Sequence, residues 1–148
     1  MTRRTHTMQQ VAQLADDSAD AALQVLAQQQ QALGEAEAQL AELHLFAHEY
    51  QHRADRGIHS MGELLNRQQF LQRIGDAIGF QQRLVEQLRE ALASQRQLWL
   101  QARNRAKALA GVADHLQADD ARAEERKEQR EADEHAQRHV ASAFRDQR

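Results

Sequence analysis

The chain has 148 residues, of which 41% are hydrophobic but only 4% aromatic, and it contains no Pro and no Cys. So few large rings cannot fill a thick globular core, whereas abundant Ala, Gln, Leu, Arg and Glu favour long helices. A formal net charge of -3, from 19 basic and 22 acidic residues, argues against nucleic acid as a partner. Without Cys there is no disulfide or thiol catalysis, and we find neither a secretory signal nor an apolar stretch of transmembrane length. We therefore expect a protein that is cytoplasmic, or peripherally attached to something that is not, and that does not insert into a membrane.

A heptad pattern runs through residues 12–50. Two rows of mostly Ala and Leu, three residues apart, recur every seven residues and form the a and d positions of a coiled coil. The rows are Ala12, Ala19, Leu26, Leu33, Leu40 and Ala47, and Ala15, Ala22, Gln29, Ala36, Leu43 and Tyr50. This pattern predicts a first helix over about residues 3–54.

A second heptad pattern runs without a break through residues 74–116. Its rows are Ile74, Gln81, Leu88, Gln95, Ala102, Leu109 and Leu116, and Ile78, Val85, Leu92, Trp99, Ala106 and Ala113. It predicts a second, longer helix over about residues 61–140. From both patterns we take the large side chains of the core to be Leu26, Leu33, Leu40, Leu43, Tyr50, Ile78, Val85, Leu88, Leu92, Trp99 and Leu109.

The two patterns are separated by a turn at about residues 55–60. Gly57 and Gly62 interrupt the helical preference, and Ser60 with Glu63 has the spacing of a capping box. A short connection makes two long helices antiparallel neighbours, so the sequence predicts an all-α, two-helix coiled-coil hairpin that forms one domain over 1–148.

The position of the turn predicts which seam residues meet. If the chain reverses near residues 58–59, paired residue numbers add to about 117. Leu26 then lies opposite Leu92, and Ala19 lies opposite Trp99, a small residue against a large one.

A charged tail begins at about residue 117. Its seam positions become Asp120, Lys127, Arg130 and Glu134, which cannot form an apolar core, although charges four residues apart can support a solvated helix. Val140, Ala141, Ala143 and Phe144 restore a small apolar patch at the end. Two interpretations stay open: a fraying tail, or a segment that becomes ordered against a partner.

The segment His48-Glu49-Tyr50-Gln51-His52 matches the zinc-protease motif H-E-x-x-H. The longer form of that motif requires Gly at 55 and His at 58, where this chain has Asp55 and Ile58. The heptad also places His48 and His52 on the outer face, with His44 one turn before them. We interpret these histidines as solvated surface residues and predict no catalytic residue, no metal and no cofactor.

The block 67–78, Arg-Gln-Gln-Phe-Leu-Gln-Arg-Ile-Gly-Asp-Ala-Ile, followed by Leu98-Trp99, resembles the flagellar export protein family FliJ. The approach to the turn is similar too, through Ala36-Glu37, Leu40 and Glu49-Tyr50. The resemblance implies a non-enzymatic, stalk-like coiled coil of the type III flagellar export apparatus. Such proteins insert into the ring of the export ATPase FliI and promote it, contact the membrane export gate protein FlhA, and bind export chaperones. The implied location is cytoplasmic, at the inner membrane beneath the flagellum.

The resemblance also implies a gate-binding surface formed by Phe70, Ile74, Ala77 and Gln81. Because Phe70 falls off the ideal seam, we interpret it as an exposed anchor, and the alternative is a cap on the seam. The anchor interpretation predicts that Phe70→Ala keeps the helices but weakens gate binding. Gly75 and Gly79 lie on the same stretch and lower its helix propensity. They are either substitutions without a function that the helix tolerates, or positions where a partner approaches the backbone closely.

Two other functions remain open at this stage. One is the equivalent stalk of a virulence injectisome, and the other is a generic coiled-coil dimer in which Ala19 and Trp99 face a second chain. We expect the hairpin itself to be monomeric when free.

Overall fold

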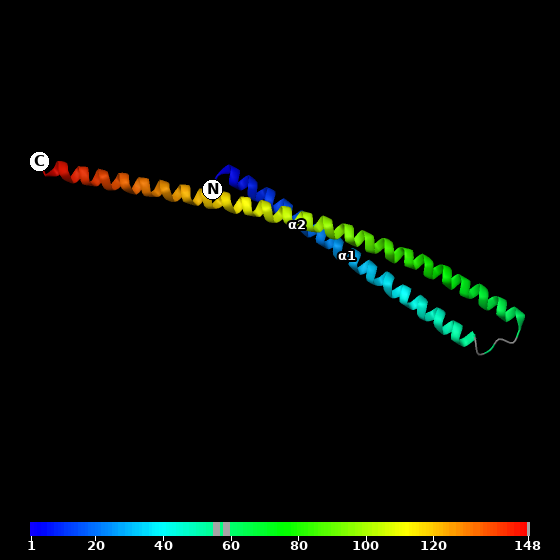
Figure 1. Cartoon of the computed structure of the whole chain (residues 1–148). Coiled ribbons are helices and arrows are strands. Elements are labelled where there is room, and N and C mark those ends of the chain that lie inside the picture. The colour runs from blue at the N-terminus through cyan, green and yellow to red at the C-terminus, as the bar shows by residue number, and fades with distance from the viewer. Residues whose placement is uncertain (55–56, 58–59, 148) are drawn as a thin grey trace. The chain divides into compact units, whose positions relative to one another are not determined.

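The computed structural model describes residues 1–54, 57 and 60–147. It contains two helices, α1 (Arg3–Ala54, 52 residues) and α2 (Met61–Asp146, 86 residues) (Figure 1). No strand occurs among the described residues. The predicted all-α hairpin with a longer second helix is confirmed, and α2 extends to Asp146, beyond the predicted end at about residue 140.

Contacts divide the chain into two compact units. Unit 1 comprises Met1–Ala19 and Ala102–Arg148, and unit 2 comprises Asp20–Gln101. Within each unit a part of α1 lies against a part of α2 that runs in the opposite direction (Figure 1). The predicted pairing of Ala19 with Trp99 joins residues of different units and stays a prediction, as does the single domain.

The starts of both helices are capped by hydroxyl side chains. Ser60 Oγ accepts a hydrogen bond of 3.2 Å from the backbone N–H of Glu63, as the predicted capping box requires. At α1, Thr2 Oγ1 accepts one of 3.2 Å from the backbone N–H of Thr5. The expected reversal at residues 58–59 lies outside the described residues.

The core of unit 2 follows the heptads. Leu33, Ala36, Val85 and Leu92 form a buried cluster, and further leucines pack against it: Leu26, Leu40, Leu84 and Leu88. The remaining predicted core residues of this unit are half-buried: Leu43, Tyr50, Ile78 and Trp99. The seam is therefore narrow, because two packed helices can enclose only the side chains at the a and d positions of each.

Two seam glutamines fix how α1 and α2 align in unit 2. Gln81 Nε2 donates to the Ala36 carbonyl at 3.0 Å, and Gln95 Nε2 donates to the Ala22 carbonyl at 3.1 Å. In both pairs the two residue numbers add to 117, as the predicted position of the turn requires. Gln81 also donates to Gln39 Oε1 at 3.1 Å, so its amide is buried with two partners.

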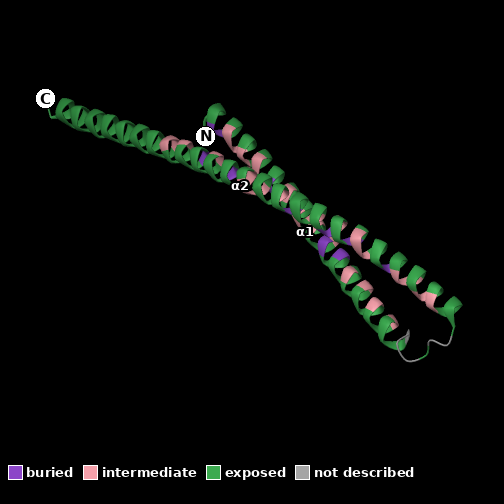
Figure 2. Cartoon of the chain, turned by 45° about the vertical axis from the view of Figure 1, so that its right-hand side comes forward, coloured by how far each residue is buried: buried purple, intermediate pink, exposed green. Residues whose placement is uncertain are grey.

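Unit 1 has a thinner core. Ala106 and Ala113 are buried and Leu109 is half-buried, so small side chains dominate. The seam ends with Thr5, which is fully buried, and the half-buried Asp120. Every residue described from 121 to 147 is exposed, as the uniform colour of this end of α2 shows (Figure 2).

Candidate functional site

Three aromatic rings gather where α1 ends and α2 begins. The ring of Phe70 lies 4.3 Å from that of Tyr50 and 6.0 Å from that of Phe46, measured between centroids. The second distance is typical of a favourable aromatic pair, and the rings of Phe70 and Tyr50 lie slightly closer than is usual. Phe70 and Tyr50 are half-buried, whereas Phe46 is 50% exposed. The contact favours the interpretation of Phe70 as a cap on the seam over that of an exposed anchor.

The other residues of the predicted gate-binding surface separate into two groups. Ile74 and Gln81 are buried, so in this structure they hold α2 against α1 and offer little surface to a partner. Ala77 is exposed on α2. Whether the four residues bind the export gate stays a prediction, but only Ala77 and the outer part of Phe70 are accessible.

A groove on α1 supplies apolar surface that the heptads did not reveal. It is lined by Gln39, Glu42, Leu43, Leu45, Phe46 and Glu49. Leu45 is 60% exposed, and its neighbour Phe46 links the groove to the aromatic cluster. The Leu45-Phe46 pair is the sequence feature that could have predicted this groove. Both residues are large and apolar, and both lie outside the a and d positions that a two-helix seam buries.

The charges around this groove define the partner that would fit it. Glu42 and Glu49 are exposed at its rim, and none of the lining residues is basic. An apolar patch with a carboxylate rim suits a segment that inserts aliphatic or aromatic side chains and places Lys or Arg beside them. We call the aromatic cluster together with this groove the turn-end surface.

A set of hydrogen bonds lies at the end of the seam in unit 1. Asp120 Oδ2 accepts hydrogen bonds from Thr5 Oγ1 at 2.5 Å, from the Thr2 backbone N–H at 3.0 Å and from Thr2 Oγ1 at 3.3 Å. The hydroxyl of Thr5, followed by the amide of Thr2, lowers the pKa of Asp120, against an opposing effect of desolvation. The sequence pattern marks Asp120 only as a charge that does not suit an apolar core, so it did not predict these hydrogen bonds.

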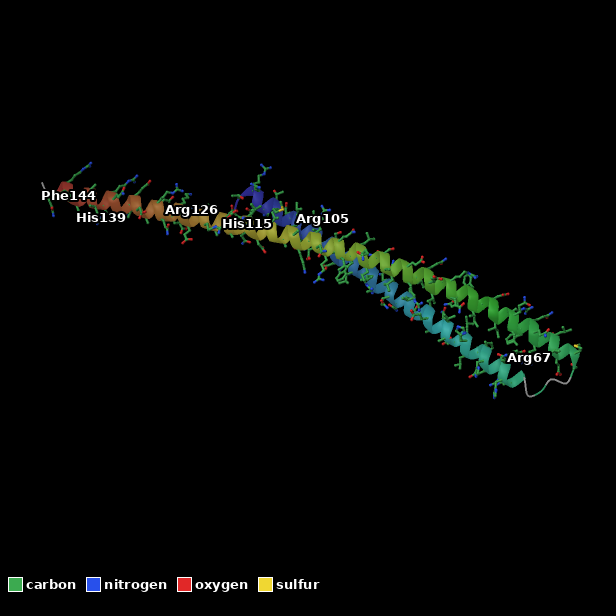
Figure 3. The ribbon with its side chains drawn as sticks, in the orientation of Figure 1. Arg67, Arg105, His115, Arg126, His139 and Phe144 are labelled. Atoms are coloured by element: carbon green, nitrogen blue, oxygen red, sulfur yellow. The ribbon has the colours of Figure 1, made fainter. Side chains whose placement is uncertain are left out.

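The last part of α2 carries charges and two exposed apolar side chains. Asp119 pairs with Arg122 and, at 3.5 Å, with His115, and the hydrogen bond from Arg122 is the main cause of its lowered pKa. Further along, Val140 is 61% exposed and Phe144 is 75% exposed. Figure 3 shows Arg126, His139 and Phe144 projecting from this helix. We call residues 121–146 the exposed tail.

The H-E-x-x-H motif lies on the outside of α1. His44, His48, Glu49 and His52 are all exposed, as their predicted place outside the seam requires. In the described parts of the chain, no group of three or more His, Cys, Asp or Glu residues is placed to hold a metal ion.

Comparison with known protein families assigns the chain to a family. The family model described as "Flagellar FliJ protein" matches residues 5–144. This chain belongs to the FliJ family. No curated relative and no solved structure matches it. FliJ proteins are flagellar, export-associated coiled-coil components, and the family is not one of enzymes.

The FliJ match covers the turn-end surface and all but the last two residues of the exposed tail. It begins at Thr5, which bonds to Asp120, and ends at Phe144 in the exposed tail. It therefore includes the whole turn-end surface as well.

Neither α1 nor α2, over the residues described, has a stretch long and apolar enough to cross a membrane.

Proposed function

We propose that this FliJ-family chain is the stalk of a bacterial flagellar type III export apparatus. It inserts into the ring of the export ATPase FliI, promotes ring activity, couples the ring to the export gate FlhA and binds export chaperones. It acts in the cytoplasm at the inner membrane. The flagellar description of the matching family favours this function over that of an injectisome stalk.

The observation that carries the proposal is the exposed tail. A helix usually buries one apolar stripe, yet every described residue from 121 to 147 is exposed. Val140 and Phe144 present apolar surface without a counterpart from α1. A partner that surrounds a helix, such as an annular ATPase, can contact all its faces at once, including its alternating charges.

The turn-end surface supports the coupling part of the proposal. It lies in unit 2, whereas the exposed tail belongs to unit 1, so the ring and the gate would contact different units. Leu45 and Phe46 offer the apolar area of this surface, and Glu42 and Glu49 offer its charge. Phe70 holds the α1 and α2 sides of this surface together.

The ATPase interaction is tested with the full chain. We expect it to bind the flagellar ATPase in a pull-down and to increase the rate of ATP hydrolysis. The double variant Val140→Ser/Phe144→Ser should lose most of this stimulation while its helix content stays unchanged by circular dichroism. Leu23→Ser, which alters an exposed leucine of α1, is the matched control and should stimulate normally. Absence of both binding and stimulation by the unaltered chain would contradict the proposal.

The gate interaction is tested on the turn-end surface. Leu45→Ser removes exposed apolar area and should weaken binding to the cytoplasmic part of the gate protein by about tenfold or more, because central apolar contacts dominate interface energy. Phe70→Ala should weaken gate binding too, but it should also lower stability because Phe70 packs on Tyr50. Equal gate binding by wild type, Leu45→Ser and the Leu23→Ser control would remove this surface from the proposal.

A further inference from the structure

A second stripe of uncharged residues runs along α2 beside the seam. Its members are spaced alternately three and four residues apart, as in the seam itself: Ala77, Phe80, Leu84, Gln87, Ala91, Ser94 and Leu98. None of the seven is charged, over three heptads of a chain that is 28% charged. Phe80 is 62% exposed and Leu98 is 56% exposed, while Leu84 also packs on the hairpin core. This spacing is the one that receives another helix.

We propose that the stripe of one molecule pairs with the stripe of a second copy, antiparallel about a two-fold axis at Gln87. In an isologous contact each residue meets a partner from the same patch, so the patch must be complementary to itself. The sequence has this property. With Gln87 facing Gln87, Leu84 faces Ala91, Phe80 faces Ser94, and Leu98 faces Ala77. Every large side chain meets a small one, which lets two helices approach closely.

The flanking charges agree with the same alignment. Arg83 and Glu90 are both exposed, and both lie along the edge of the stripe that is remote from the seam. The antiparallel pairing brings Arg83 of one copy opposite Glu90 of the other, twice by symmetry. A parallel in-register pairing would instead place Phe80 on Phe80 and Arg83 on Arg83, with large residues and like charges opposed. The stripe therefore favours antiparallel over parallel pairing of the two copies.

The size of the contact sets its strength. The stripe spans about 30 Å of helix at 1.5 Å per residue, which buries less than a standard protein interface. The pairing is therefore weak and reversible, with a dissociation constant between about 1 µM and 1 mM. It differs from a coiled-coil dimer in which α1 of one chain packs on α2 of another, because both hairpins stay intact and only their outer faces meet.

Sedimentation equilibrium of the full chain tests the pairing. We expect the average mass to rise from that of the monomer toward twice that value as the concentration is raised to about 1 mM. Phe80→Ser/Leu98→Ser should weaken association by about tenfold or more. Leu23→Ser, at an exposed leucine of α1, should associate like the wild type. A monomer at every concentration would overturn the proposal, and the ATPase and gate assays above would be unaffected by that result.

Charge exchange and crosslinking test the alignment. Arg83→Glu should weaken association, and Arg83→Glu/Glu90→Arg should restore it. Because the chain has no Cys, Gln87→Cys places one thiol at the predicted axis and should give a disulfide-linked dimer under mild oxidation. Phe80→Cys should crosslink poorly. Rapid crosslinking through position 80, or no rescue by the charge exchange, would contradict the antiparallel pairing.

Discussion

Residues 74–101 and residues 121–146 belong to the same helix but are helical for different reasons. In the first segment α2 packs against α1, and Ile74, Val85 and Leu92 are buried. In the second segment no described residue is buried, and helix-forming side chains with alternating charge are all that favour the helix. The comparison shows that one continuous helix can combine a packed, stable part with a part held only by local interactions.

The largest expected difference between these segments is in hydrogen exchange. Amides of 74–101 open only when the hairpin separates, whereas those of 121–146 open by local fraying. We predict exchange at least about a hundredfold faster in the exposed tail of the free protein, measured by mass spectrometry. Equal protection in both segments would mean that the tail is packed against something in the free molecule.

A core substitution should have the next largest effect. Leu33→Ala removes a buried side chain from the central cluster of unit 2 and should lower the free energy of unfolding by about 3 kcal/mol. Val140→Ala, in the exposed tail, should change it by less than about 0.5 kcal/mol. Urea denaturation followed by circular dichroism measures both. A similar loss in the two variants would abolish the distinction between the segments.

The seam glutamine should contribute less than the leucine. Gln81→Ala removes the buried amide that bonds to the Ala36 carbonyl and to Gln39, at an expected cost of about 1–2 kcal/mol. Gln82→Ala alters the adjacent exposed glutamine and serves as the matched control. If both variants unfold at the same urea concentration as wild type, the hydrogen bonds of Gln81 do not stabilise the hairpin.

The smallest effect should appear in acid, at the end of the seam in unit 1. The folded-state pKa of Asp120 lies below its unfolded value, so its contribution to stability is present above about pH 4 and is lost as pH falls through the folded pKa. Thr5→Val removes the main donor and should reduce the dependence of unfolding on pH below about 4. Unchanged acid sensitivity in this variant would show that Thr5 does not hold the Asp120 carboxylate in solution.

Much of this fold was predictable because a coiled coil repeats one physical rule along the chain. The heptads located both helices and the seam, and Ser60 with Glu63 located the start of α2. The contacts outside that rule were not predictable. The heptad placed Asp120 at a seam position but gave no sign that Thr5 and Thr2 donate hydrogen bonds to its carboxylate. It placed Phe70 off the ideal seam but did not predict that its ring packs on those of Tyr50 and Phe46. Such contacts depend on side-chain placement at the seam ends, where the heptad no longer constrains it.

The most direct test of the antiparallel seam is a disulfide between Leu26→Cys and Leu92→Cys in a chain that has no other Cys. Both leucines belong to the core of unit 2, so we predict a rapid intramolecular bond that leaves the mass unchanged and raises the unfolding temperature. The pair Leu26→Cys/Val85→Cys, displaced by one heptad, should not form it. No bond at 26 and 92, or a bond that links two chains, would contradict the hairpin.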